Sequence, residues 1–257
     1  MKHLVIPDTQ VKDCVDLTYL DWVGRYIVDH RPDVIIHIGD FADMPSLSLY
    51  DVGKKSFEGR RYLRDIEVAK AAMQRLLAPM REYNALKKKN KEKLYKPRMI
   101  MTLGNHEDRI SRAVNADSKL EGVMSVDDLG FAEQGWEVYP YLQPVIVNGI
   151  VYCHYFTSGI MGRPVTSAQL LLQKKHQSCV MGHVQDRQIA YSRRADGRQI
   201  TGIFAGCCYL HDEDYLGQQG NDYWRGIWVL HEVNEGSFDE MPVSMGYLRG
   251  RYGERTK

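Results

Sequence analysis

The chain has 257 residues, 44% of them hydrophobic, which is enough to bury a substantial core in one domain. Its 34 Lys and Arg residues balance its 33 Asp and Glu residues, so no overall field would attract it to nucleic acid or to an anionic membrane. No apolar stretch approaches the length of a membrane span, and the apolar start ends at Asp8, too early for a signal peptide. The five cysteines follow neither zinc-ribbon nor disulfide-scaffold spacing. We expect a single domain over residues 1–257, without a membrane partner, in a reducing, cytoplasmic compartment.

The first part of the chain alternates between strand and helix patterns. Residues 3–7 and 33–38 are short apolar runs that predict buried strands, and residues 17–27 between them carry apolar side chains at helical spacing. Asp13 or Asp16 can cap that helix, and Pro32 ends it. Strand, helix and strand form a βαβ unit, and ligands of α/β sheets gather at the carboxyl ends of such strands.

A long helical pattern fills residues 60–94, as one helix or as two with a kink at Pro79. Its end, residues 87–93, is strongly cationic. We favour a solvated terminus, where cations face the negative end of the helix dipole, over a patch that contacts phosphates. The arginines at 193, 194 and 198 and at 249, 251 and 255 are interpreted in the same way, as solvated faces.

The rest of the chain is rich in strand patterns. Short apolar or alternating runs predict strands at residues 98–102, 136–139, 145–147, 150–156, 178–182, 187–193, 198–204 and 223–233. Asn148-Gly149 predicts a hairpin, and further turns fall at Asp196-Gly197 and at residues 234–236. Residues 108–130 predict short helices and turns, and residues 166–176 one short helix. Together these patterns indicate a mixed α/β protein.

Polar clusters follow five of the apolar strands, where a reaction centre can form at the edge of a sheet. Any one of them alone is more often a turn, a cap or a buried histidine with its hydrogen bonds satisfied. In chain order the clusters are Asp8-Thr9-Gln10, Gly39-Asp40-Phe41-Ala42-Asp43, Gly104-Asn105-His106-Glu107, His154 and Gly182-His183-Val184-Gln185.

This order resembles the calcineurin-like metallophosphoesterases, whose motifs read DxH, GDxxD, GNH[D/E], H and GHxH. The match spans residues 4 to 185 and departs at Gln10 and Gln185, where the family usually has histidine. The resemblance implies an α/β fold in which a two-sheet β-sandwich is flanked by helices. Met44-Pro45 stands where the protein Ser/Thr phosphatase branch has arginine and glycine, so the chain looks more like bacterial and phage nucleases, phosphodiesterases and general phosphatases.

The resemblance also implies a role for each matched residue. Two divalent ions would share the bridging carboxylate of Asp40, and a bound hydroxide would attack phosphorus in line. One ion would take Asp8, Gln10, Asp40 and Gln185, and the other Asp40, Asn105, His154 and His183. His106 would serve as the general acid, with Asp43 holding its ring. His37 is a candidate neighbour of the ligands, and His176, His211 and His231 are interpreted as core or surface histidines.

Amide oxygen in place of imidazole at Gln10 and Gln185 makes the first position all-oxygen, which suits Mg²⁺ or Mn²⁺ better than Zn²⁺. We expect Mn²⁺ to activate best, with Mg²⁺, Zn²⁺, Fe²⁺ and Ni²⁺ as alternatives. The expected function is metal-dependent hydrolysis of a phosphoric ester by a phosphatase or phosphodiesterase, with a nucleotide or nucleic acid as a favoured substrate. The competing interpretation is a non-catalytic scaffold that kept the fold after its metal site decayed. The pattern leaves the oligomeric state open.

Overall fold

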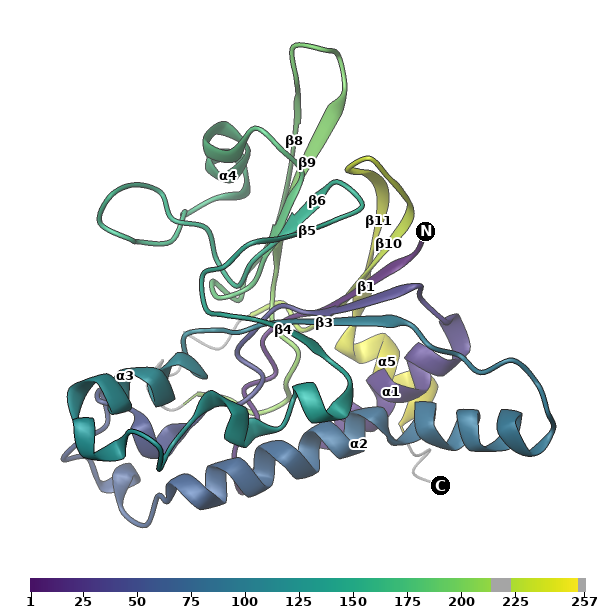
Figure 1. Ribbon diagram of the computed structural model, residues 1–257. Helices are drawn as coiled ribbons and strands as arrows, with labels where there is room; N and C mark the ends of the chain where they lie inside the picture. Colours follow the sequence, from purple (N-terminus) through teal and green to yellow (C-terminus); the bar gives the residue numbers. More distant parts are fainter. Residues whose placement is uncertain (214–222, 254–257) are drawn as a thin grey trace.

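The computed structural model describes residues 1–213 and 223–253, and within them two β-sheets pack face to face between helices (Figure 1). This is the sandwich that the resemblance predicts. In spatial order the first sheet contains β11 (Ser237–Ser244), β10 (Gly226–Asn234), β1 (His3–Ile6), β2 (Val34–His37), β3 (Arg98–Thr102) and β4 (Glu137–Tyr139). The second contains β5 (Val145–Val147), β6 (Ile150–Tyr152), β7 (Cys179–Met181), β9 (Gln199–Ala205) and β8 (Arg187–Arg193).

The centre of each sheet is parallel. Strands β1 to β4 run parallel to one another in the first sheet, and β6, β7 and β9 do so in the second. The antiparallel strands β10, β11, β5 and β8 lie outside these parallel sets. The carboxyl ends of the parallel strands therefore meet at common edges, where ligands of α/β sheets bind.

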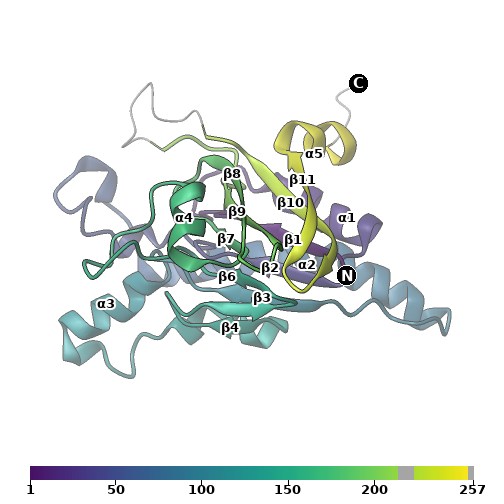
Figure 2. The ribbon, with the colours of Figure 1, turned by 90° about the horizontal axis from the view of Figure 1, so that it is seen from above.

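Helices cover both outer faces (Figures 1 and 2). Helices α1 (Thr18–His30), α2 (Tyr62–Lys89) and α5 (Met245–Tyr252) pack on the first sheet, and α4 (Ala168–Lys175) packs on the second. Side chains alternate along β1 between two hydrophobic cores. Leu4 and Ile6 pack against the helices, whereas Val5 packs against the other sheet. Helix α3 (Asp108–Ala116) follows β3. Short 3₁₀ turns occupy residues 45–47, 55–57, 118–120, 126–129 and 132–134.

Most of the predicted elements are present with shifted ends. Helix α2 is one continuous helix that contains Pro79, and its surface residues Leu63 and Leu86 are exposed although they belong to the apolar pattern. Gly24 of α1 touches α2 at this proline, where a Cβ atom would overlap the Leu76 carbonyl. Glycine at position 24 therefore allows the two helices to approach closely at Pro79.

Individual side chains and turns set the ends of several helices and strands. Asp16 accepts a hydrogen bond from the Thr18 backbone N–H at 2.8 Å just before α1 begins, so Asp16 rather than Asp13 supports the start of this helix. Asn148 and Gly149 have φ values of 49° and 85° and join β5 to β6, as the hairpin prediction requires. The strand predicted at 150–156 ends at Tyr152, because the chain leaves the sheet there to deliver the next residues to its edge.

Strand β11 and helix α5 were not predicted. Pro242 and the charged Asp239 and Glu240 hide the strand pattern, and an edge strand tolerates all three. Two glycines weaken the helical pattern of α5, whose Ser244 cap accepts a hydrogen bond from the Tyr247 N–H at 3.2 Å. Of the arginines near the chain end, residue 255 lies outside the described residues. Among the described helices, none combines the length and the apolar character needed to cross a bilayer.

Candidate active site

The five polar clusters come together at one end of the sandwich. Asp8, Asp40 and the Asn105 cluster follow β1, β2 and β3, while His154 and His183 follow β6 and β7 of the facing sheet. Backbone and side chains from both sheets touch here, since the His183 N–H lies 3.2 and 3.1 Å from the two carboxylate oxygens of Asp8. The site thus lies where the carboxyl ends of the two parallel sets converge.

Four of these residues turn lone pairs toward one point. His154 Nε2 lies 2.9 Å from Asn105 Oδ1 and 3.3 Å from Asp40 Oδ2. His183 Nδ1 lies 2.8 Å from the same Asn105 oxygen. His154 Nδ1 lies 3.0 Å from the Ile38 carbonyl and donates its proton there, so Nε2 is the ring nitrogen that can bind a metal ion once it loses its own proton. Ligand atoms of Asp40, His154 and His183 all lie within 4.8 Å of one another, so this group can hold a metal ion.

The other half of the site is arranged differently. Asp8 is fully buried, and Gln10 and Gln185 are 2% and 6% exposed. Gln185 Oε1 accepts a hydrogen bond of 2.7 Å from the hydroxyl of Tyr209. The donor set here is two carboxylates and two amides, a combination that suits a hard divalent cation. The residues present in both halves therefore fit divalent metal ions.

Backbone strain is concentrated in the same place. Gln10, Asp40, His183 and Gln185 have φ values of 40°, 50°, 66° and 63°, in the left-handed region that non-glycine residues rarely adopt. Each such residue costs on the order of 1–3 kcal/mol, and clusters of them are found at functional sites. The fold therefore supports an arrangement of these side chains that the local backbone disfavours.

Two glycines make the close packing of the ligand loops feasible. A Cβ atom on Gly104 would overlap the Asp40 carboxylate, and one on Gly182 would overlap that of Asp8. The glycines of the GN and GH motifs therefore let the β3 and β7 loops approach the carboxylates that follow β1 and β2.

Charges within the cluster favour an added cation. Burial raises the pKa of Asp8 to about 7. Burial also opposes ionisation of Asp40, but the adjacent His106 and His154 outweigh it and hold the Asp40 pKa well below its usual range. Burial would lower the pKa of His154, yet the carboxylate of Asp40 raises it to about 9. By contrast, burial and the neighbouring His154 lower the His183 pKa to about 4. A buried group of carboxylates and imidazoles with these opposing shifts is typical of a site that binds positive charge.

His106 and Asp43 form a pair beside this cluster. His106 Nδ1 lies 2.7 Å from Asp43 Oδ1, and its Nε2 lies 3.7 Å from Asp40 Oδ2. Burial would lower the His106 pKa, but the charge of Asp40 and the hydrogen bond to Asp43 raise it above its ordinary value. The imidazole is thus held in a fixed orientation and kept able to carry a proton, as a general acid requires.

Four residues that support this pair carry no recognisable sequence signal. The Lys12 ammonium lies 3.3 Å from Asp43 and 2.7 Å from Glu213, although the latter is 201 positions away in the chain. Arg109 NH1 donates to the Asp43 carbonyl at 2.7 Å, and its NH2 lies 3.4 Å from His106 Nε2. His211, interpreted from sequence as a core or surface residue, lies 2.9 Å from Glu213 and so joins this network.

Glu107 is the one motif residue whose role the sequence did not reveal. Its buried carboxylate accepts three backbone N–H groups, from Gly104 at 2.7 Å, Ala42 at 2.9 Å and Asp40 at 3.0 Å. These bonds tie the loop after β2 to the loop after β3, which carry the Asp40 and Asn105 side chains. His37, expected near the ligands, lies buried with Nε2 3.2 Å from Thr9 Oγ1.

A cavity of about 1310 Å³ opens beside the site. Asn105, His106 and His183 are among the residues that line it, and many others come from residues 48–64. Tyr50 is part of this lining and is 85% exposed. This volume exceeds the roughly 300–1,000 Å³ of ordinary small-molecule pockets, so the space suits an extended substrate.

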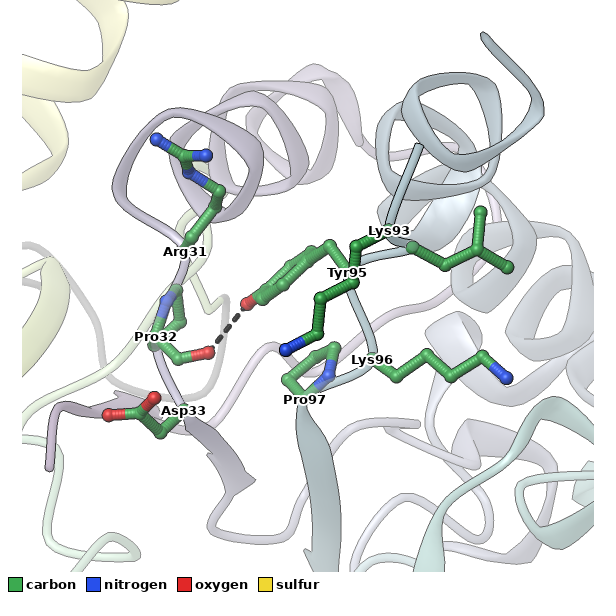
Figure 3. A pocket seen from close by; sticks show the side chains of 8 residues that line it. Arg31, Pro32, Asp33, Lys93, Tyr95, Lys96 and Pro97 are labelled. Atoms are coloured by element: carbon green, nitrogen blue, oxygen red, sulfur yellow. Dashed lines mark hydrogen bonds between the residues drawn. The ribbon is translucent and has the colours of Figure 1, made fainter. Parts of the chain in front are cut away.

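Lys93, at the end of the cationic stretch that continues beyond α2, borders a different cavity of about 520 Å³ before the amino ends of β2 and β3. Tyr95 closes it by donating to the Pro32 carbonyl at 2.7 Å (Figure 3). In the same view the Lys93 side chain lies across the pocket, whereas those of Arg31 and Lys96 point away from it. Because the cations diverge, the geometry favours a solvated face over a phosphate site.

The ordered motifs and the converging ligand atoms define a metal-dependent class of enzymes. The chain belongs to the calcineurin-like phosphoesterase family, whose model matches residues 1–216. Membership supports a hydrolase of phosphoric esters that uses divalent metal ions, although some relatives in this family are not catalytic.

Two phage proteins are similar over part of their length. The Gene 54 protein of Mycobacterium phage D29 is 40% identical over 78 residues, which cover 30% of this chain and 29% of that protein. The Gene 54 protein of Mycobacterium phage L5 is 39% identical over 79 residues, or 31% and 29%. The match with this chain thus covers less than a third of the length of each of these curated relatives. A solved crystal structure at 10% identity has a TM-score of 0.42 over 95% of this chain and 99% of its own.

Proposed function

We propose that this protein hydrolyses phosphoric esters with two divalent metal ions, of which Mn²⁺ activates best. The observation that carries the proposal is the convergence of Asp40, Asn105, His154 and His183 beside the His106–Asp43 pair. When bound, the ions would supply an activated water as nucleophile and would neutralise charge on the phosphoryl group. Asp40 would be shared, with Asp8, Gln10 and Gln185 completing the first position and Asn105, His154 and His183 the second.

The protein's own side chains would handle the leaving group. His106 would donate a proton to the departing oxygen, a contribution of typically ~10²–10⁴ in rate. Asp43 would hold the ring through Nδ1, and Lys12 and Arg109 would in turn hold Asp43. A decayed scaffold would have no need of this pair, so the 2.7 Å bond between His106 and Asp43 favours an enzyme over the non-catalytic alternative.

We further propose that nucleic acid or a nucleotide is the substrate, with a single strand lying in the large cavity. Most wall cations are paired, such as Arg60 with Asp51 and Arg64 with Asp13. The Arg61 side chain, by contrast, donates only to the Arg60 carbonyl among the described residues, so it can approach a phosphate. The exposed Tyr50 ring is available to stack on a base, which is worth about 1–3 kcal/mol per base.

The catalytic proposal is tested with nitrophenyl phosphate mono- and diesters, assayed with and without added Mn²⁺, Mg²⁺, Zn²⁺, Fe²⁺ or Ni²⁺. We expect metal-dependent hydrolysis of at least one ester. A protein that binds metal but cleaves none of them would support the scaffold alternative.

The substrate proposal is tested with Tyr50→Ala. We expect KM for a single-stranded oligonucleotide to rise about 5- to 150-fold, with nitrophenyl ester hydrolysis unchanged. Leu49→Ala is the matched control, because Leu49 is also exposed, at 80%, but does not line the cavity. Equal oligonucleotide kinetics in Tyr50→Ala and the parent would exclude a strand along this wall.

The state of the cysteines bears on the cellular compartment of the protein. All five cysteines are unpaired, and four of them are buried. Free thiols persist in reducing surroundings, so we propose a cytoplasmic location.

A further inference from the structure

The connection between β9 and β10 lies behind the half of the site that contains the glutamines. The Cys208 N–H donates to the Asp8 carbonyl at 2.8 Å. The next residue, Tyr209, donates its hydroxyl to Gln185 Oε1 at 2.7 Å. Two of the residues proposed for the first metal position are therefore held by adjacent residues of one segment, which lies outside the five motifs.

Tyr209 is itself firmly fixed. Its side chain is fully buried, and its ring stacks on His211 with centroids 4.5 Å apart and an interplanar angle of 23°. The Arg225 guanidinium lies over the same ring at 5.4 Å. The hydroxyl therefore has a defined position from which to act on Gln185.

Glutamine needs such support more than histidine does. An imidazole is oriented by the partner of its second nitrogen, as His154 is by the Ile38 carbonyl. A glutamine has more rotatable bonds and an amide that can present either oxygen or NH₂, and only the oxygen can bind a cation. A donor on one lone pair of Oε1 distinguishes the two ends of the amide and leaves the second lone pair for a ligand.

We propose that Tyr209 is a positioning residue of the metal centre, whose hydroxyl directs the amide oxygen of Gln185 toward the first ion. The inference rests on the proposed two-ion function and adds a residue that acts only through Gln185. Loss of an outer partner of this kind typically lowers metal affinity about 10- to 100-fold.

The test is calorimetric titration of chelator-treated protein with MnCl₂. In Tyr209→Phe we expect the weaker of two binding events to lose about 10- to 100-fold in affinity, with the tighter event unchanged. Tyr152→Phe is the matched control, because it removes another buried phenol hydroxyl, the one 2.8 Å from His3 Nδ1 between the sheets. Both affinities should be unchanged there.

A second pair of variants separates positioning from a general effect on folding. In a Gln185→His background the imidazole no longer depends on the phenol for the choice of ligand atom, so adding Tyr209→Phe should leave both Mn²⁺ affinities unchanged. An equal loss in both backgrounds, or an equal loss of both ions, would overturn the inference. So would unchanged affinity in Tyr209→Phe, or a parent protein that binds one ion only.

These outcomes are independent of the catalytic proposal. If the parent binds two ions and hydrolyses no nitrophenyl ester, the proposed activity fails while the titration still tests Tyr209. If the parent hydrolyses the ester and Tyr209→Phe binds both ions normally, only the role of Tyr209 fails.

Discussion

The two halves of the site meet at the same edge but are built by different means. In the half with His154 and His183, ring nitrogens and the Asn105 oxygen already converge, and the Ile38 carbonyl fixes the tautomer of His154. In the half with Gln10 and Gln185, the ligand candidates are neutral amides, and at Gln185 the support comes from a tyrosine of a distant segment. The half with the histidines therefore has its geometry built in, whereas the half with the glutamines depends on neighbouring side chains.

The largest effect is expected where the halves join. Asp40→Asn should abolish activity and lower occupancy at both positions, because this carboxylate is the residue they would share. His183→Ala should lower the metal occupancy mainly at one of the two positions. Elemental analysis of the purified variants measures the ions retained, and two ions in Asp40→Asn would show that the halves are independent.

The next effect separates metal binding from proton transfer. His106→Ala should lower kcat by roughly 10²–10⁴ while both ions stay bound, since the ring is held by Asp43 and is not one of the proposed metal ligands. Asn105→Ala, one residue away, should lose the tighter ion instead. Equal metal loss in the two variants would mean that the role given to His106 is wrong.

The stability of the fold itself is expected to fall at low pH because of His3. His3 lies buried between the sheets, where burial lowers its pKa from 6.5 to about 4. As pH falls, His3 binds a proton in the unfolded chain before it does so in the folded protein. The stability that neutral His3 gives to the fold is therefore fully present above pH 6.5 and is lost between pH 6.5 and about pH 4. The difference corresponds to roughly 3 kcal/mol. His3→Gln should flatten the pH dependence of the urea-unfolding free energy over this range, and an unchanged slope would contradict the assignment.

The smallest effect concerns the metal preference of the weaker half. Changing Gln10 and Gln185 together to His adds softer ligands, and affinity for Zn²⁺ at this position should rise, with the optimum for activation moving away from Mn²⁺. In the parent, added Mn²⁺ should raise activity in the millimolar or sub-millimolar range. Calorimetry and metal-activation curves measure both, and identical Zn²⁺ affinity would show that these side chains point away from the ion.

The motif residues could be predicted because each directly follows a strand, and parallel strands bring their ends together. The residues that support them could not be found in this way. Lys12 and Glu213 are 201 positions apart, and Tyr209 reaches Gln185 from a connection with no periodic pattern. Strand β11 was missed for a related reason, since an edge strand with Pro242 lacks the apolar pattern of a buried one.

The most direct test of the account is the stepwise loading of the two positions. Titration of the chelator-treated protein with Mn²⁺ should give two binding events of unequal affinity, with the tighter one lost in His154→Ala and the weaker one lost in Gln185→Ala. Two equal events, or a tighter event that survives His154→Ala, would contradict the account.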